Sequence, residues 1–228
     1  MLNNKTIRLF GIFAVISSLI ICFSDILITY NPDPGNGGVE KEILDLFMLE
    51  FSNLRIYLGT FLGLFFIPFY CLGYYLIYKA IKPAGKYIPL IFLLISIFGL
   101  IFGFSQIHSS FGYKALFLKS GYKVSEEFLN YYKSCIKNIL PFQMIIIIVS
   151  YSLSIFINSI IFIFVVIMRN TLYKKWMLLC NPLFIILLFS GLSRIFPNIF
   201  SILRPISVNF GNFIFFLTPT ILLWNIKE

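Results

Sequence analysis

The residues best able to do chemistry are polar or charged side chains that lie within or beside long apolar runs. Asp25 lies inside the first of these runs. A carboxylate at the centre of a membrane costs about 2.5–3.5 kcal/mol on insertion scales, so it needs a cation, a hydrogen-bond donor or water. The residues that we expect to form a site with it are Arg55, Tyr70, His108, Gln143, Arg194, Asn209 and Asn212.

Three functions fit this set. The favoured interpretation is an outward-facing polar pocket that binds or moves a small or lipid-like ligand. The second is a membrane-embedded enzyme that modifies a lipid, with Asp25 and His108 in proton transfer. The third is a bacteriocin self-immunity or membrane-stress protein. Asp25 and Arg55 could also form a structural ion pair between the first two helices, and the sequence leaves that alternative open.

Several kinds of catalytic site are excluded. A single histidine cannot supply an intramembrane metal site that needs two or three, and we expect neither a metal nor a cofactor. HExxH, P-loop, GxGxxG and GxSxG motifs are absent. The four cysteines form no CxxC pair. A Ser109–His108–Asp25 relay is disfavoured, because adjacent residues of a helix point about 100° apart.

The composition is that of an integral membrane protein. Of 228 residues, 59% are hydrophobic and 12% charged, and the mean hydropathy is +0.93. Soluble domains carry about 25% charged residues. The net charge of +9 is spread over the ends of apolar runs, where basic residues set orientation and contact lipid headgroups. Nucleic acid is therefore excluded as a partner, and membrane lipid is expected.

Six segments are apolar and long enough to cross a membrane as helices, which takes roughly 20 residues each. We therefore predict an all-α, polytopic transmembrane bundle that forms a single domain over residues 1–228. The first segment is interpreted as a helix rather than a signal peptide, because no small-x-small cleavage site follows it. The predicted helices are Arg8–Tyr30, Ile56–Tyr78, Ile88–Ser110, Ile139–Met168, Trp176–Ser193 and Ile206–Trp224.

The connections between these helices predict an orientation. Basic residues crowd the start of the chain and two short turns, which the positive-inside rule places in the cytoplasm. The longer connections hold seven of the nine acidic residues. Both termini would then be cytoplasmic, in the cell membrane. The basic residues concerned are Lys5, Arg8, Lys79, Lys82, Lys86, Arg169, Lys174 and Lys175.

Two of the outer connections carry amphipathic patterns, at Val39–Asn53 and Val124–Asn138. We expect short helices there that cap the bundle or close over a pocket. Within the third helix, Ser96, Gly99, Gly103, Gln106 and Ser110 fall on one face and indicate close packing. His108 lies about 200° from Gln106, so it shares that face only if the helix has ended or unwound.

Short motifs in the first half resemble an uncharacterised bacterial family of small six-helix membrane proteins. The similarity covers about residues 8–112. The motifs are Ser24-Asp25, Arg55-x-x-x-Gly59-x-x-x-Gly63, Pro68-x-Tyr70-x-x-Gly73 and His108-Ser109. The family typically has glycine before the aspartate, where this chain has Ser24. The resemblance implies that Asp25, Arg55 and His108 belong to one site, and it implies no activity.

Overall fold

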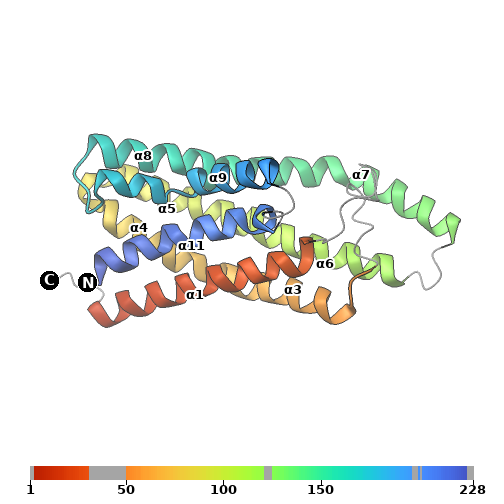
Figure 1. Ribbon diagram of the computed structural model, residues 1–228. Coiled ribbons are helices and arrows are strands. Elements are labelled where there is room, and N and C mark those ends of the chain that lie inside the picture. Colours follow the sequence, from red (N-terminus) through yellow and green to blue (C-terminus); the bar gives the residue numbers. More distant parts are fainter. Residues whose placement is uncertain (1–2, 31–49, 121–124, 197–199, 201, 225–228) are drawn as a thin grey trace.

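The structure is a computed structural model that describes residues 3–30, 50–120, 125–196, 200 and 202–224. Over these residues the chain is helical and contains no strand. Figure 1 shows the helices lying side by side along one long axis. The predicted all-α class is confirmed for this part of the chain.

The first half of the chain forms three long helical rods. The first rod is α1 (Asn4–Thr29), which Asn3 caps by accepting a hydrogen bond from the Thr6 amide at 2.8 Å. In the second rod a 3₁₀ turn replaces α-helix geometry around Pro68. It comprises α3 (Asn53–Phe66), η3 (Ile67–Phe69), α4 (Tyr70–Ile81) and η4 (Lys82–Ala84). The third comprises α5 (Tyr87–Gly99), a π-helix η5 (Leu100–Phe104) and α6 (Ser105–Ser120).

The second half begins with a rod that also contains a π-helix. It comprises α7 (Glu126–Tyr151), the π-helix η6 (Ser152–Ile157) and α8 (Asn158–Met168). The 3₁₀ helix η7 (Lys175–Cys180) then leads into α9 (Pro182–Ile195), whose N-cap is Asn181. The last helix is α11 (Leu203–Leu223).

Within the described residues, four helical stretches are long and apolar enough to cross a membrane: Asn4–Thr29, Asn53–Ala84, Glu126–Met168 and Leu203–Leu223. Tyr87–Gly99 and Pro182–Ile195 are apolar but shorter. The length and apolar composition of these helices fit a membrane protein, and the count of six spans stays a prediction.

Of the two predicted amphipathic helices, the structure tests only one. Val124–Asn138 is not a separate short helix, because α7 runs without a break from Glu126 to Tyr151. Pro141 does not end this helix, although proline removes one backbone hydrogen bond. The sequence pattern changes from amphipathic to apolar within one continuous rod. Most of Val39–Asn53 lies outside the described residues, so that prediction is untested.

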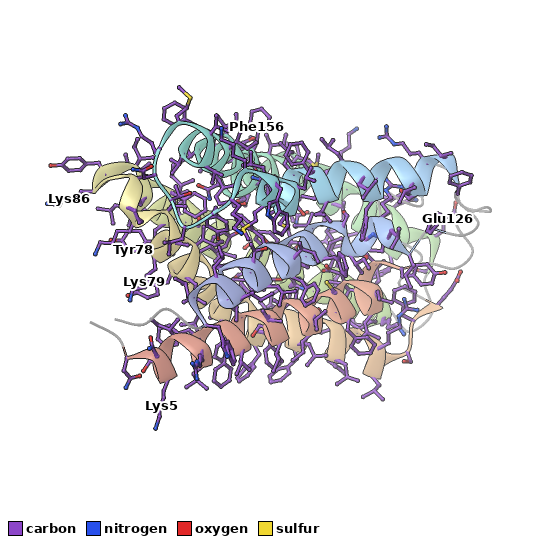
Figure 2. The ribbon with its side chains drawn as sticks, turned by 60° about the vertical axis from the view of Figure 1, so that its left-hand side comes forward. Lys5, Tyr78, Lys79, Lys86, Glu126 and Phe156 are labelled. Atoms are coloured by element: carbon purple, nitrogen blue, oxygen red, sulfur yellow. The ribbon has the colours of Figure 1, made fainter. Side chains whose placement is uncertain are left out.

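The start of α1 and the end of α11 lie at one end of the bundle, which we call the terminal end; the opposite end is the distal end (Figure 1). Arg8 of α1 donates a hydrogen bond to the Trp224 carbonyl at 3.0 Å, which ties the start of α1 to the end of α11. Figure 2 shows Lys5, Lys79 and Lys86 at the terminal end and Glu126 at the distal end. The bundle therefore has a basic end and an end that carries acidic side chains.

The core is rich in aromatic rings where α4, α5, α8 and α11 meet. The Phe216 ring packs edge-on against Tyr70 and Tyr74, with ring centroids 5.0 and 5.1 Å apart. Phe215 makes similar edge contacts with Phe162 at 4.9 Å and with Phe92 at 6.5 Å. Such edge-to-face pairs are the preferred arrangement of aromatic rings. They hold α11 against α4 on one side and against α5 and α8 on the other.

The two π-helices lie where the third rod packs on the fourth. Gly99 faces Ser154 and Gly103 faces Ser150, so closely that a Cβ on either glycine would overlap the serine side chain. A π-helix contains an extra residue per turn, which rotates everything after it relative to an unbroken α-helix. The packed face predicted for the third helix therefore ends at Gly103. Beyond it, Gln106 is exposed, whereas His108 is buried. The expectation that Gln106 continues that face was wrong for this reason.

We expect Gly99→Ala to lower the free energy of unfolding by about 1–3 kcal/mol, because the added methyl overpacks the contact with Ser154. Gly191→Ala is the matched control, since this helical glycine has no atom within 4 Å of the added Cβ. It should leave stability unchanged or raise it by roughly 0.5–1 kcal/mol. Unfolding in detergent measures both, and equal stability of the two variants would contradict the assigned packing.

Candidate functional site

Asp25 lies one turn before the distal end of α1 and is 8% exposed. Its Oδ2 accepts a hydrogen bond from the Asn209 side-chain nitrogen at 2.5 Å. Its Oδ1 lies 3.5 Å from Nε2 of His108. The carboxylate is therefore held between an amide of α11 and an imidazole of α6. These contacts offset part of the cost of removing a carboxylate from water.

His108 is 1% exposed and reaches Asp25 because the π-helix η5 turns this side chain inward. Its other ring nitrogen, Nδ1, lies 3.3 Å from the Ser24 hydroxyl oxygen. The ring packs on Gly63 of α3, where a Cβ would overlap the imidazole. The missing side chain at position 63 thus makes the space that His108 occupies.

A ladder of tyrosines and asparagines extends the site toward the terminal end. Tyr70 donates a hydrogen bond to Oδ1 of Asn209 at 2.7 Å, and Tyr74 donates to Oδ1 of Asn212 at 3.1 Å. The spacing of four residues on α4 and three on α11 puts both pairs on facing sides of these helices. The side-chain nitrogen of Asn212 is buried and has no partner among the described residues.

Arg55 does not pair with Asp25. Its guanidinium donates hydrogen bonds to three carbonyl oxygens at the end of α1, those of Leu27 at 2.6 Å, Tyr30 at 2.5 Å and Ile26 at 3.2 Å. The last four carbonyls of a helix lack partners within it, and a guanidinium with five donors suits them. The sequence correctly placed Arg55 beside the end of helix 1, but the predicted ion pair was wrong.

Two other predicted site residues lie apart from this cluster. Arg194 is exposed in the last turn of α9, and Gln143 is half-buried on α7. Neither makes a contact with Asp25 in the described part of the chain. Depth in the membrane alone had suggested them, and depth does not say which way a side chain points around its helix.

Sequence reasoning also missed two contributors. Ser24 had been noted only as a departure from the family pattern, yet its hydroxyl contacts His108 and donates to the Gly59 carbonyl at 2.5 Å. Tyr74 lies one turn after Tyr70, and that spacing could have identified it. We use the name Asp25 cluster for Ser24, Asp25, Tyr70, His108 and Asn209.

The Asp25 cluster consists of groups of the kinds that donate and accept protons. Asp25 and His108 are ionisable groups within reach of each other, and the amide and hydroxyl groups around them complete a hydrogen-bonded chain. Within the described residues, no group of three His, Cys, Asp or Glu side chains is placed to hold a metal ion. Buried ionisable groups in membrane helices characteristically mark ion, proton or substrate pathways.

A double-mutant cycle can separate the contacts of Asp25. We expect Asp25→Asn and Asn209→Ala to show a coupling energy within about 0.5–3 kcal/mol, because the two side chains share a buried hydrogen bond. Asp25→Asn and Arg55→Gln should couple less, because Arg55 binds backbone carbonyls. Unfolding in detergent measures both cycles. A larger coupling energy with Arg55 than with Asn209 would contradict the assigned contacts and support an ion pair between Asp25 and Arg55.

Comparison with known proteins places the chain in a family. A family model matches residues 1–228, so the similarity extends beyond the 8–112 segment whose motifs first indicated it. The predicted relationship to an uncharacterised family is thereby confirmed. Searches of curated proteins and of solved structures return no match. The chain belongs to the family of unknown function DUF6796.

Proposed function

We propose that this protein is a six-span protein of the cell membrane that binds or moves a small or lipid-like ligand at the Asp25 cluster. The observation that carries this proposal is the Asp25–His108 contact at 3.5 Å inside the bundle, with exposures of 8% and 1%. A carboxylate and an imidazole kept together in such a place cost stability. A role in binding or proton exchange accounts for that cost.

The arrangement of the cluster supports a role in moving a ligand as well as binding it. Asp25 lies on α1, and its contacts reach α6 directly and α4 through Asn209 of α11. A proton or a cationic ligand group that neutralises the carboxylate changes the interactions that hold these helices together. Such a change can shift the bundle between two arrangements if the ligand prefers one of them.

We expect the purified protein to retain a ligand that Asp25→Asn and His108→Gln release, with at least a tenfold loss of affinity. The reason is that each change removes the charge or the imidazole while it keeps a side chain of similar size. Native mass spectrometry of the protein released from mild detergent measures the bound mass. Gln143→Leu is the control, because Gln143 makes no hydrogen bond or ion pair with the cluster within the described residues.

Two results would count against the proposal. One is a protein that carries no bound molecule and shows no shift in thermal stability with any small ligand offered to it. The other is a ligand that Asp25→Asn and His108→Gln retain as well as Gln143→Leu does. Either result would leave the Asp25 cluster with a structural role in helix packing only.

One observation favours the enzyme alternative. The His108 imidazole lies between a hydroxyl and a carboxylate. It is 3.3 Å from the Ser24 hydroxyl on one side and 3.5 Å from the Asp25 carboxylate on the other. This order of groups is that of a nucleophile, a base and an orienting acid. However, Ser24 directs its proton to the Gly59 carbonyl at 2.5 Å, so the base does not receive it. Covalent labelling of Ser24 by a fluorophosphonate would favour the enzyme.

The proposed orientation puts the basic terminal end in the cytoplasm and the Asp25 cluster in the outer half of the membrane. We expect single cysteines at Asn36 and Ser125 to react with a membrane-impermeant thiol reagent in intact cells. Cysteines at Lys82 and Lys174 should react only after the cells are opened. The reference is a background in which the four native cysteines are replaced. Labelling at Lys82 in intact cells would reverse the orientation.

A further inference from the structure

An apolar groove of about 460 Å³ lies between α1 and α11, in the terminal half of the bundle and apart from the Asp25 cluster. Its walls are formed by Ile12 and Ile16, which are 42% and 47% exposed, and by Ile221, which is 64% exposed. It is therefore open to the surroundings of the bundle. The remaining lining residues are Val15, Leu217, Thr220 and Trp224.

Helices α1 and α11 approach closely beside the groove. Gly11 of α1 faces Thr220 of α11, and a Cβ at position 11 would overlap the threonine side chain. The Thr220 hydroxyl donates to the Phe216 carbonyl at 2.7 Å, so its polar group is satisfied within α11. What the groove presents beside this contact is chiefly hydrocarbon, which suits an acyl chain.

The end of the groove nearest the termini is basic. The Arg8 guanidinium carbon lies 5.2 Å from the centre of the Trp224 ring, and Trp224 lines the groove. Arg8 uses Nε to bind the Trp224 carbonyl at 3.0 Å. Its terminal nitrogens make no hydrogen bond within the described part of the chain. Lys5 is one turn earlier on α1, is exposed, and has no acidic residue beside it in the first turn.

We propose that this groove binds one anionic phospholipid, with an acyl chain along α1 and α11 and the headgroup phosphate at Arg8 and Lys5. Positions 8 and 16 are roughly 12 Å apart along α1, so the basic and apolar parts have the spacing of a headgroup and its upper acyl chain. Arg8 presents planar donors that match phosphate oxygens, and Trp224 belongs at the boundary between headgroups and hydrocarbon.

Charge complementarity decides the class of occupant. A zwitterionic lipid would fill the apolar walls equally well, but its headgroup has no net charge to offer Arg8 and Lys5. A second copy of this chain would bring the same two cations to the same place, where they repel. An anionic lipid satisfies both ends of the groove at once.

Fluorescence quenching by brominated lipids tests the proposal at the groove itself, because the chain has two tryptophans and one of them lines it. Trp176→Phe isolates Trp224, and Trp224→Phe isolates Trp176, which is 60% exposed and outside the groove. The protein is reconstituted into vesicles of phosphatidylcholine and phosphatidylglycerol, with bromine on the acyl chains of one lipid at a time.

We expect brominated phosphatidylglycerol to quench Trp224 about fivefold more than its share of the lipid accounts for, the preference that one basic side chain near an anionic surface supplies. Quenching of Trp176 should be in proportion to the share of the brominated lipid in the vesicle. Arg8→Gln in the Trp176→Phe background should reduce the preference toward the bulk value, and Lys86→Gln, at the same end of the bundle, should leave it intact. Asp25→Asn should also leave it intact.

Quenching of Trp224 that follows the bulk composition in the parent protein would overturn the proposal, since the groove would then hold any lipid. Quenching by neither brominated lipid would also overturn it and would indicate a second protein chain in the groove. If Arg8→Gln lowers thermal stability, Lys5→Gln gives an independent reading, because the Lys5 side chain makes no hydrogen bond or ion pair within the described residues. An unchanged preference in both variants would exclude the assigned headgroup site.

Discussion

The carboxylate of Asp25 imposes the strongest constraint on this bundle. It lies among apolar helices, where an unpartnered charge or hydrogen-bonding group is costly, and Asn209 and His108 supply its partners. Asn209 must then be held in place by Tyr70, and His108 by the space over Gly63. The relative positions of α1, α4, α6 and α11 follow from these contacts at one level of the bundle.

The two π-helices extend that constraint to the rest of the structure. Gly99, just before η5, packs on Ser154 of η6, and Gly103, within η5, packs on Ser150 of α7. After η5 the helix has rotated, so that His108 faces α1 and α3 instead. A regular α-helix could not present both sets of residues inward. The π-helix thus lets one rod pack on η6 with its first part and supply His108 to the Asp25 cluster with its second. Such turns frequently occur at functional sites.

Helices α1 and α11 contribute to both ends of the molecule. Near the distal end they hold Asp25 against Asn209, and near the terminal end they form the apolar groove beside Arg8 and Trp224. The close contact of Gly11 with Thr220 lies at the groove itself, because Thr220 is one of its lining residues. A lipid in the groove and a ligand at the Asp25 cluster would therefore contact the same pair of helices, which offers a physical route for one to influence the other.

Composition and hydropathy determined the class of this protein without any structure. Apolar segments of helical length require that backbone groups be satisfied within helices, so the all-α class followed directly. The cost of an intramembrane carboxylate indicated that Asp25 needs polar partners. His108 and Asn209, both expected near it, do contact it, and Tyr70 is bonded to Asn209. Those inferences rest on composition and on position along the chain, which the sequence states explicitly.

Only the tertiary structure decided which side chains meet. The sequence paired Asp25 with Arg55 by charge, whereas the backbone carbonyls at the end of α1 compete for the same guanidinium and bind it. It put Gln106 on the packed face because it assumed an unbroken α-helix, and η5 rotates that face away. Gln143 and Arg194, which the sequence placed at the outer side of the membrane, make no hydrogen bond or ion pair with Asp25 within the described residues. Depth follows from residue number, whereas direction depends on helix rotation, which is set by packing between segments far apart in the chain.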